Sequence, residues 1–417
     1  MTSRSAAGLR INPDFTRLWA AQAVSALGSR FTRTALPVIA ILTLGGDARD
    51  VAWLAALSVM PGVLVGLCAG GFVDRTRKRT LLIWADLVRA ILVASIPVAA
   101  WLDGLSLEHL YLVAAAAGAA TTLFQIADNA FLPTLVGKDQ LVAANARIEA
   151  TDATAEITGP ALAGILIQVV TAPVTLLLDA LSFVWSAALL ARIRAREILA
   201  PQSEARGVLA RLVDDLRVGW IQGLRHPVVG PTFAALALQT FFGGFFFALY
   251  MLYTLRTLGL DAGTVGVIIG VGGGGALCGS LIARHMDRIF GLGPAMILAL
   301  ALGQAGSLLI PAAAEAGAFQ IPFLVLHQFL GDGFLVAFLI HAVSLRQTLL
   351  PTEILGRVNA TYHVAAGLLL PVGTLLAGVL ADRIGIAAAV WIGVVGGLLA
   401  PLALLRPAIL QLRRTPS

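Results

Sequence analysis

The sequence predicts an all-α membrane protein with twelve transmembrane helices in two six-helix pseudo-repeat halves. Of its 417 residues 58% are hydrophobic and only 12% are charged, with a mean hydropathy of +0.89. A soluble domain carries about twice that fraction of charge. The apolar runs reach the roughly 20 residues that a helix needs to cross a bilayer, and they lack the alternation of a membrane barrel. Motifs that recur in the second half of the chain indicate the repeat.

The twelve apolar segments fall into two groups of six, separated by a polar stretch. We expect residues 1–191 to form the N-terminal half, residues 192–227 a cytoplasmic linker, and residues 228–417 the C-terminal half. The linker's apolar positions have helical spacing, which predicts an amphipathic helix on the inner leaflet, where cations meet anionic lipid. A regulatory partner site is the alternative for the linker. The predicted spans are 18–44, 51–73, 80–101, 109–132, 148–170, 173–191, 229–255, 262–283, 292–314, 318–344, 360–381 and 385–405.

The positive charges predict the orientation of these spans. If both termini are cytoplasmic, most of the 29 Lys and Arg residues lie in cytoplasmic segments, as is usual for membrane proteins. Only Arg49, Arg256 and Arg383 then lie in outer loops. The net charge of +6 is therefore explained by topology, and no nucleic-acid partner is expected from basic residues dispersed over loops.

Two pairs of motifs indicate an internal duplication. Gly66-x-x-x-Gly70-x-x-x-Asp74-Arg75 recurs as Gly279-x-x-x-Ala283-x-x-x-Asp287-Arg288, without the basic residues that follow the first copy. Leu132-Pro133-Thr134 recurs as Leu350-Pro351-Thr352. Parallel repeats of this kind are typical of transporters whose substrate site lies at the midplane between the halves.

The segment Gly70–Arg79 reads Gly-Gly-Phe-Val-Asp-Arg-Thr-Arg-Lys-Arg and links predicted spans 2 and 3. It resembles the signature loop of the major facilitator superfamily, although the pattern's usual glycine is Arg77 here. The resemblance implies a cytoplasmic gate in which Asp74 meets the positive end, or a cation, of a helix in the other half. The residues that carry this gating motif are Gly70, Asp74, Arg75, Lys78 and Arg79.

A second motif lies in predicted span 5. Ala155-x-x-x-Gly159-Pro160-x-x-Ala163-Gly164 resembles a motif of the superfamily's proton-coupled exporters, with alanine at two glycine positions. Proline bends a helix and glycine permits close packing, so we expect a kinked helix at Gly159, Pro160 and Gly164. A kinked span without a role in coupling is the alternative.

Matches outside these motifs narrow the resemblance to one branch of the superfamily. They include Asn12-Pro13 and Arg17-Leu18-Trp19 near the start and Gly356-Arg357-Val358-Asn359 near the end. The branch is the drug-efflux group with macrolide and enterobactin-type exporters. The chain departs from it at Arg30, where the group usually has an acidic residue shortly after Gly28.

Charged residues inside the predicted spans are the main candidates for substrate binding or proton coupling. Arg30 and Arg33 lie three residues apart on one face of span 1. Each costs roughly 2.5–3.5 kcal/mol at the bilayer centre on insertion scales, so both should face partners or water. A fixed salt-bridge network is the alternative. The candidate carboxylates are Asp128, Asp152, Glu156 and Asp179 in the first half, with Asp332 as the main ionisable site of the second.

Predicted span 7 is rich in aromatic residues. Gln239, Phe241, Phe245 and Phe246 are candidate substrate contacts, because a lipophilic ligand requires aromatic walls with a few polar groups. Aromatic side chains occur all around this helix, so packing against lipid or the core is the alternative.

The sequence therefore predicts a secondary active transporter, which exports a lipophilic or amphiphilic small molecule (drug, siderophore or secondary metabolite) by alternating access driven by protons. An importer of an anionic solute using Arg30 and Arg33, and a non-transporting membrane receptor, are the alternatives. We expect a monomer in the cell inner (plasma) membrane, in contact with lipid. No enzyme activity, cofactor or metal site is expected, since no nucleophile, nucleotide or ligand motif stands out.

Overall fold

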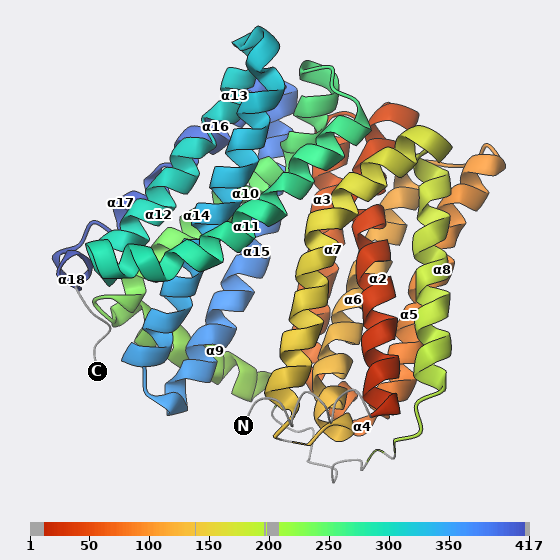
Figure 1. Cartoon of the computed structure of the whole chain (residues 1–417), viewed down its shortest axis with the longest axis horizontal. Coiled ribbons are helices and arrows are strands. Elements are labelled where there is room, and N and C mark those ends of the chain that lie inside the picture. The colour runs from red at the N-terminus through yellow and green to blue at the C-terminus, as the bar shows by residue number, and fades with distance from the viewer. Residues whose placement is uncertain (1–11, 138, 196, 198–207, 413–417) are drawn as a thin grey trace. The chain divides into compact units, whose positions relative to one another are not determined.

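The computed structural model describes residues 12–137, 139–195, 197 and 208–412, and within them it contains helices and no strands (Figure 1). All twelve predicted segments are helical. The helices of the first half are α2 (Pro13–Val38) with a π-helical end η1 (Ile39–Thr43), α3 (Ala48–Cys68), α4 (Gly70–Arg75), α5 (Lys78–Trp101), α6 (Leu107–Leu135), α7 (Leu141–Val170) and α8 (Ala172–Ala191).

The second half follows the linker helix α9 (Val208–Arg225). Its helices are α10 (Val229–Leu252) with a π-helical end η2 (Tyr253–Thr257), α11 (Ala262–Phe290), α12 (Leu292–Gly306), α13 (Leu309–Ala312), the 3₁₀ turns η3 (Ala313–Glu315) and η4 (Gly317–Phe319), α14 (Gln320–Leu349), α15 (Thr352–Ile384), α16 (Ile386–Gly397), α17 (Leu399–Ala403) and α18 (Pro407–Leu410).

Eleven helical segments within the described residues are long and apolar enough to cross a membrane. The predicted first span, α2 with η1, is not among them. Its sequence includes Gln22, Arg30 and Arg33, and these polar residues lower its hydropathy. The same helix carries the candidate charges, so it requires internal partners for them rather than contact with lipid.

The chain divides into two compact units, residues 1–46 with 57–206 and residues 47–56 with 207–417. In the first unit α2 packs against α7 and α8, and α5 packs against α6 and α8. Figure 1 shows α2, α7 and α8 side by side as long helices. The start of α2 is fixed by Asn12, whose side chain accepts hydrogen bonds from the N–H groups of Asp14 and Phe15 and donates one to the carbonyl of Leu135.

In the second unit α14 packs against α11 and α12, and α10 packs against α15 and α16. Small residues allow the closest of these contacts. A Cβ atom at Gly275 would overlap the backbone of Phe329, and one at Gly279 would overlap the backbone of Gly333, so α11 and α14 touch almost backbone to backbone. Gly279, which belongs to the repeated motif, is thus used for packing within one half.

The structure contains a repeat that the sequence motifs did not predict. The π-helical turn at the end of α2 leads into Thr43-Leu44-Gly45-x-Asp47-Ala48, and the one at the end of α10 leads into Thr257-Leu258-Gly259-x-Asp261-Ala262. Gly45 and Gly259 have nearly the same positive φ, 70° and 69°. Asp47 and Asp261 then accept hydrogen bonds from N–H groups three residues on. The first and seventh spans therefore end in the same structure, as a duplication requires.

The linker helix α9 packs against α15 in the second unit. Thr361 donates a hydrogen bond to the carbonyl of Leu216 (3.3 Å). One side of the linker is therefore occupied by protein, while Trp220 remains 50% exposed. The predicted contact of this helix with the inner leaflet stays a prediction.

Candidate functional site

In the first unit, two arginines on α2 face two carboxylates on α7. The Arg30 Nη2 atom lies 2.9 Å from Glu156 Oε2 and 3.9 Å from Asp152 Oδ1. Arg33 contacts the other oxygen of Glu156. Spacings of three residues on α2 and four on α7 place each pair on one helix face. Glu156 is therefore shared by two guanidinium groups, and the cluster of four residues has a formal charge of zero.

A glycine determines how closely the two helices approach. A Cβ atom at Gly159 would overlap the Arg30 side chain at its Cβ and Cγ atoms. Pro160 and Gly164 are buried next to it, and α7 continues through the proline. The motif thus lets Arg30 lie flat against α7, which carries its guanidinium to Glu156. A kink at Pro160 stays a prediction.

The other two candidate carboxylates of this unit contact neutral groups. Gln22 donates a hydrogen bond to Asp128, and Asp179 accepts one from Thr32 and one from Ser182. Asp179 is completely buried. Of the four carboxylates expected to pair with Arg30 and Arg33, the structure brings only Asp152 and Glu156 to them.

A buried ion pair lies nearby on α5. Arg89 contacts Asp86, and the two residues are 3% and 0% exposed. The guanidinium lies over the rings of Phe124 and Phe183, at 4.5 and 4.3 Å from their centroids. This arrangement pairs the two opposite charges inside the helix bundle.

The basic end of the gating motif contacts the end of α8 and Glu197, which follows that helix. Arg79 donates to the carbonyls of Leu190 and Ala191, the last residues of that helix. The N–H groups of Lys78 and Arg79 donate to the carboxylate of Glu197 at 2.5 and 2.9 Å. A carboxylate at a helix N-terminus is favourable, so Glu197 caps α5.

The remaining residues of the motif lie on the short helix α4. Arg75 ends this helix, while the side-chain position of Asp74 and the surroundings of Gly70 lie outside the part of the chain that the structure describes. The gating role of these residues stays a prediction.

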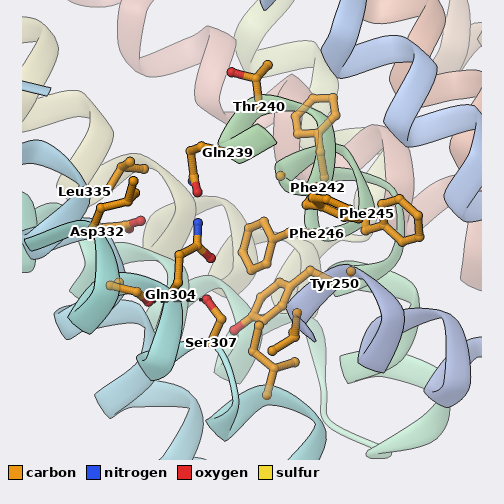
Figure 2. Close-up of a pocket in the computed structure, with 18 of the residues that line it drawn as sticks. Gln239, Thr240, Phe242, Phe245, Phe246, Tyr250, Gln304, Ser307, Asp332 and Leu335 are labelled. Carbon is orange, nitrogen blue, oxygen red and sulfur yellow. Dashed lines mark hydrogen bonds between the residues drawn. The ribbon is translucent and has the colours of Figure 1, made fainter. Parts of the chain in front are cut away.

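The second unit contains a cavity of about 430 Å³. Helix α10 contributes an aromatic wall, and α12, α14, α15 and α16 form the other sides (Figure 2). The polar and aromatic lining residues include Gln239, Phe242, Phe245, Phe246, Tyr250, Gln304, Ser307, His327, Asp332 and Tyr362. The structure thus brings Gln239, Phe245, Phe246 and Asp332 of the predicted site together around one cavity.

Phe241 is the exception, because it is not among the residues that line this cavity, and its role as a substrate contact stays a prediction. Its backbone packs against Gly373 of α15, where a Cβ atom would overlap the Phe241 carbonyl. Its ring packs against Phe242, with ring centroids 5.1 Å apart. The face of α10 that holds Phe241 is thus used to pack against α15, and Phe242 lines the cavity in its place.

Some polar groups of the cavity are buried without a hydrogen-bond partner. The Gln239 Oε1 and Tyr250 hydroxyl atoms are buried and lack a hydrogen-bond partner within the described residues. Asp332 accepts a hydrogen bond from Gln328 at 2.7 Å. Figure 2 shows Gln239 and Gln304 turned toward the space that the Phe246 and Tyr250 rings border. Buried polar atoms without partners are costly, so a ligand that donates hydrogen bonds would stabilise this site.

His327 of α14 also lines the cavity, and it is not among the residues that the sequence predicted as substrate contacts. Its ring lies 5.8 Å from that of Phe246, and Phe246 stacks against Tyr250 with centroids 4.4 Å apart. Gln304 lies on α12, Ser307 directly follows that helix, and His327 lies on α14, so all three are far from the aromatic helix in sequence. Their spacing relative to Asp332 provides no sequence signal for this cavity.

Two helical units with membrane-spanning segments, internal charges and an aromatic cavity define a multi-pass membrane transporter. The chain belongs to the Major Facilitator Superfamily, whose model matches residues 18–368. Its substrate is accordingly a small molecule, and the chain is not an enzyme, because this is a family of transporters.

The curated relatives are efflux proteins. The multidrug efflux pump Tap of Mycolicibacterium fortuitum is 26% identical over 374 residues, covering 86% of this chain and 87% of that protein. Macrolide efflux protein A of Streptococcus pyogenes is 23% identical over 415 residues, covering 96% of each.

Solved structures share the fold. A bacterial homologue of the iron transporter ferroportin, in an inward-facing state, gives a TM-score of 0.71 at 18% identity and covers 94% of this chain and 98% of its own. The nucleoside transporter NupG gives 0.72 at 13% identity, covering 95% and 99%.

Proposed function

We propose that this protein is a proton-driven exporter of lipophilic small molecules that carry a positive charge. The observation that supports it best is the cavity of the second unit, which has an aromatic wall, one carboxylate at Asp332 and no Lys or Arg among its described lining residues. Aromatic faces and a carboxylate both attract cations. The efflux activity named for both relatives agrees with export.

The charge pattern disfavours the alternative of an anion importer. Arg30 and Arg33, the cations that would attract an anionic solute, already contact Glu156. The cavity itself offers a carboxylate, which repels anions. Family membership removes the second alternative, a receptor that transports nothing.

We assign proton coupling to Glu156. This carboxylate contacts both Arg30 and Arg33. Its protonation would therefore remove the negative charge that balances these two arginines. Charges inside a membrane protein are costly without partners, and the two helices would then favour a different arrangement. Coupling of this kind needs one proton site and one substrate site. In this proposal the first unit contributes the proton site at Glu156, and the second unit contributes the substrate site at its cavity.

The proposed location is the plasma membrane, with both termini in the cytoplasm. The concentration of Lys and Arg in the loops on one side supports this orientation. We further propose that the chain works as a monomer with its spans in contact with lipid.

Accumulation in intact cells tests the direction of transport. Cells that express the protein should accumulate less ethidium, a lipophilic cation, than cells that express the Glu156→Gln variant at the same level. A protonophore should remove this difference. Higher ethidium accumulation in cells with the wild-type protein would indicate import and reject the proposal.

The substitution Asp332→Asn tests the proposed charge preference. A hydrogen bond to a charged group is worth about 1.5–3 kcal/mol, so ethidium should bind roughly 10- to 150-fold more weakly. The affinity for chloramphenicol, a neutral probe, should change by less than about twofold, because this molecule has no positive charge for Asp332 to attract. Equilibrium binding to the purified protein in detergent gives both values.

Glu108→Gln is the matched control, since this carboxylate is exposed at the start of α6. It should leave the binding of both probes unchanged. Equal losses for the cation and the neutral probe in Asp332→Asn would show that Asp332 supports the shape of the cavity rather than selecting charge.

A further inference from the structure

The linker helix is seated tightly on the second unit. A Cβ atom at Gly219 would overlap both the carbonyl of Arg357 and the hydroxyl of Thr361 on α15. Thr361 also donates to the carbonyl of Leu216. Only a residue without a side chain permits this approach, so the position of α9 against α15 is defined by direct contact with its backbone.

From this helix a series of aromatic rings leads to the cavity. The Trp220 ring meets the Phe233 ring edge to face, with centroids 5.6 Å apart. Phe233 meets Tyr362 in the same way, at 5.9 Å. Tyr362 lines the cavity. One residue of α10 therefore joins the linker to a wall of the candidate binding site.

A buried cation holds the Tyr362 ring as well. The guanidinium of Arg346 lies 4.8 Å from the ring centroid, and Arg346 is only 7% exposed. Its Nε atom has no hydrogen-bond partner within the described residues. The Tyr362 ring is thus fixed by the Phe233 ring and by Arg346. Loss of the Trp220 contact would leave Phe233 free to shift and would change the position of Tyr362.

We propose that Trp220 is a positioning residue for substrate binding, acting through Phe233 on Tyr362. The linker is then a part of the binding apparatus in addition to being a connection between the halves. This inference rests on the proposed function, because it takes the cavity of the second unit as the substrate site. A displacement of α9 would alter the affinity for substrate without any change in the lining residues themselves.

Binding of ethidium to the purified full-length protein in detergent provides the test. Trp220→Ala should weaken binding about two- to twelvefold, which corresponds to the strength of one edge-to-face ring pair. Trp220→Phe retains a ring against Phe233 and should recover most of the affinity. Ile221→Ala is the matched control, since Ile221 is the next residue, is 36% exposed and has no aromatic ring.

Transport in proteoliposomes separates positioning from a general loss of structure. Trp220→Ala should raise the half-saturating ethidium concentration by the same factor, with the maximal rate within about twofold of wild type. Its melting temperature should match that of Ile221→Ala. A fall in the maximal rate together with the melting temperature, at unchanged affinity, would show that Trp220 only stabilises the fold.

A double-mutant cycle tests the route through Tyr362. Tyr362→Leu should weaken binding by itself, and adding Trp220→Ala should have little further effect. Independent, additive losses would overturn the inference. Phe246→Ala separates the two proposals. If Phe246→Ala weakens binding while Trp220→Ala does not, the role of Trp220 is rejected and the cavity remains the substrate site. If neither variant weakens binding, both the cavity and this inference are wrong.

Discussion

Glu156→Gln is expected to retain substrate binding and to lose proton-driven accumulation. The neutral amide resembles the protonated carboxylate in shape, but it cannot release a proton or balance the charges of Arg30 and Arg33. Coupling between two linked sites is typically worth about 1–3 kcal/mol, so the accumulation ratio should fall about 5- to 150-fold. Ethidium uptake by proteoliposomes under a pH gradient measures this ratio.

Asp152→Asn is the control for this variant. Asp152 lies one turn before Glu156 on the same helix and approaches Arg30 only to 3.9 Å. The Asp152→Asn variant should therefore keep most of the ethidium accumulation that the pH gradient drives. If Asp152→Asn loses accumulation while Glu156→Gln keeps it, the coupling carboxylate is Asp152 and our assignment is wrong.

The second large effect concerns the stability of the first unit. Arg89→Met should destabilise the protein by about 3–5 kcal/mol, because it leaves the carboxylate of Asp86 buried without its cation. Changing both residues, as Asp86→Leu with Arg89→Met, should restore much of the loss, since neither charge of this pair then remains buried. Thermal unfolding of the purified protein in detergent compares these variants.

A pair with the same spacing nearer the surface provides the control. Arg17 lies 2.7 Å from Asp14, and their side chains are 32% and 19% exposed. Exposed pairs are worth about 0–1 kcal/mol, so Arg17→Met should change stability little. Equal effects of Arg17→Met and Arg89→Met would contradict the role that we assign to burial.

The sequence predicted the twelve helical segments well, because hydropathy and length determine a membrane span almost by themselves. It also indicated the cluster around Arg30, since charges at helical spacing inside an apolar run need partners on a neighbouring helix. The choice among carboxylates was less predictable. Glu156 meets Arg30 and Asp179 does not, because Gly159 lets α7 pack against the Arg30 side chain.

The cavity was predicted only in part for a different physical reason. Helix α10 is apolar on every side, so its own pattern does not show which face packs against protein. Phe242 lines the cavity and Phe241 does not, because α10 packs through Phe241 against Gly373, which is 132 residues away along the chain. The docking of α9 on α15 likewise depends on a tertiary contact at Gly219. Among the features that the sequence analysis missed, the repeated turn after η1 and η2 is different. Its residues recur in the sequence, so a comparison of the two halves could have found it.

Proton-coupled export is the central claim, and transport by the purified protein in liposomes tests it most directly. In an exporter that exchanges substrate for protons, substrate moves toward the acidic side. Acid-inside proteoliposomes, with the membrane potential clamped, should therefore accumulate ethidium above its outside concentration while protons leave, and a protonophore should abolish the accumulation. Ethidium that only equilibrates, or that accumulates equally with no pH gradient, would contradict proton-driven export.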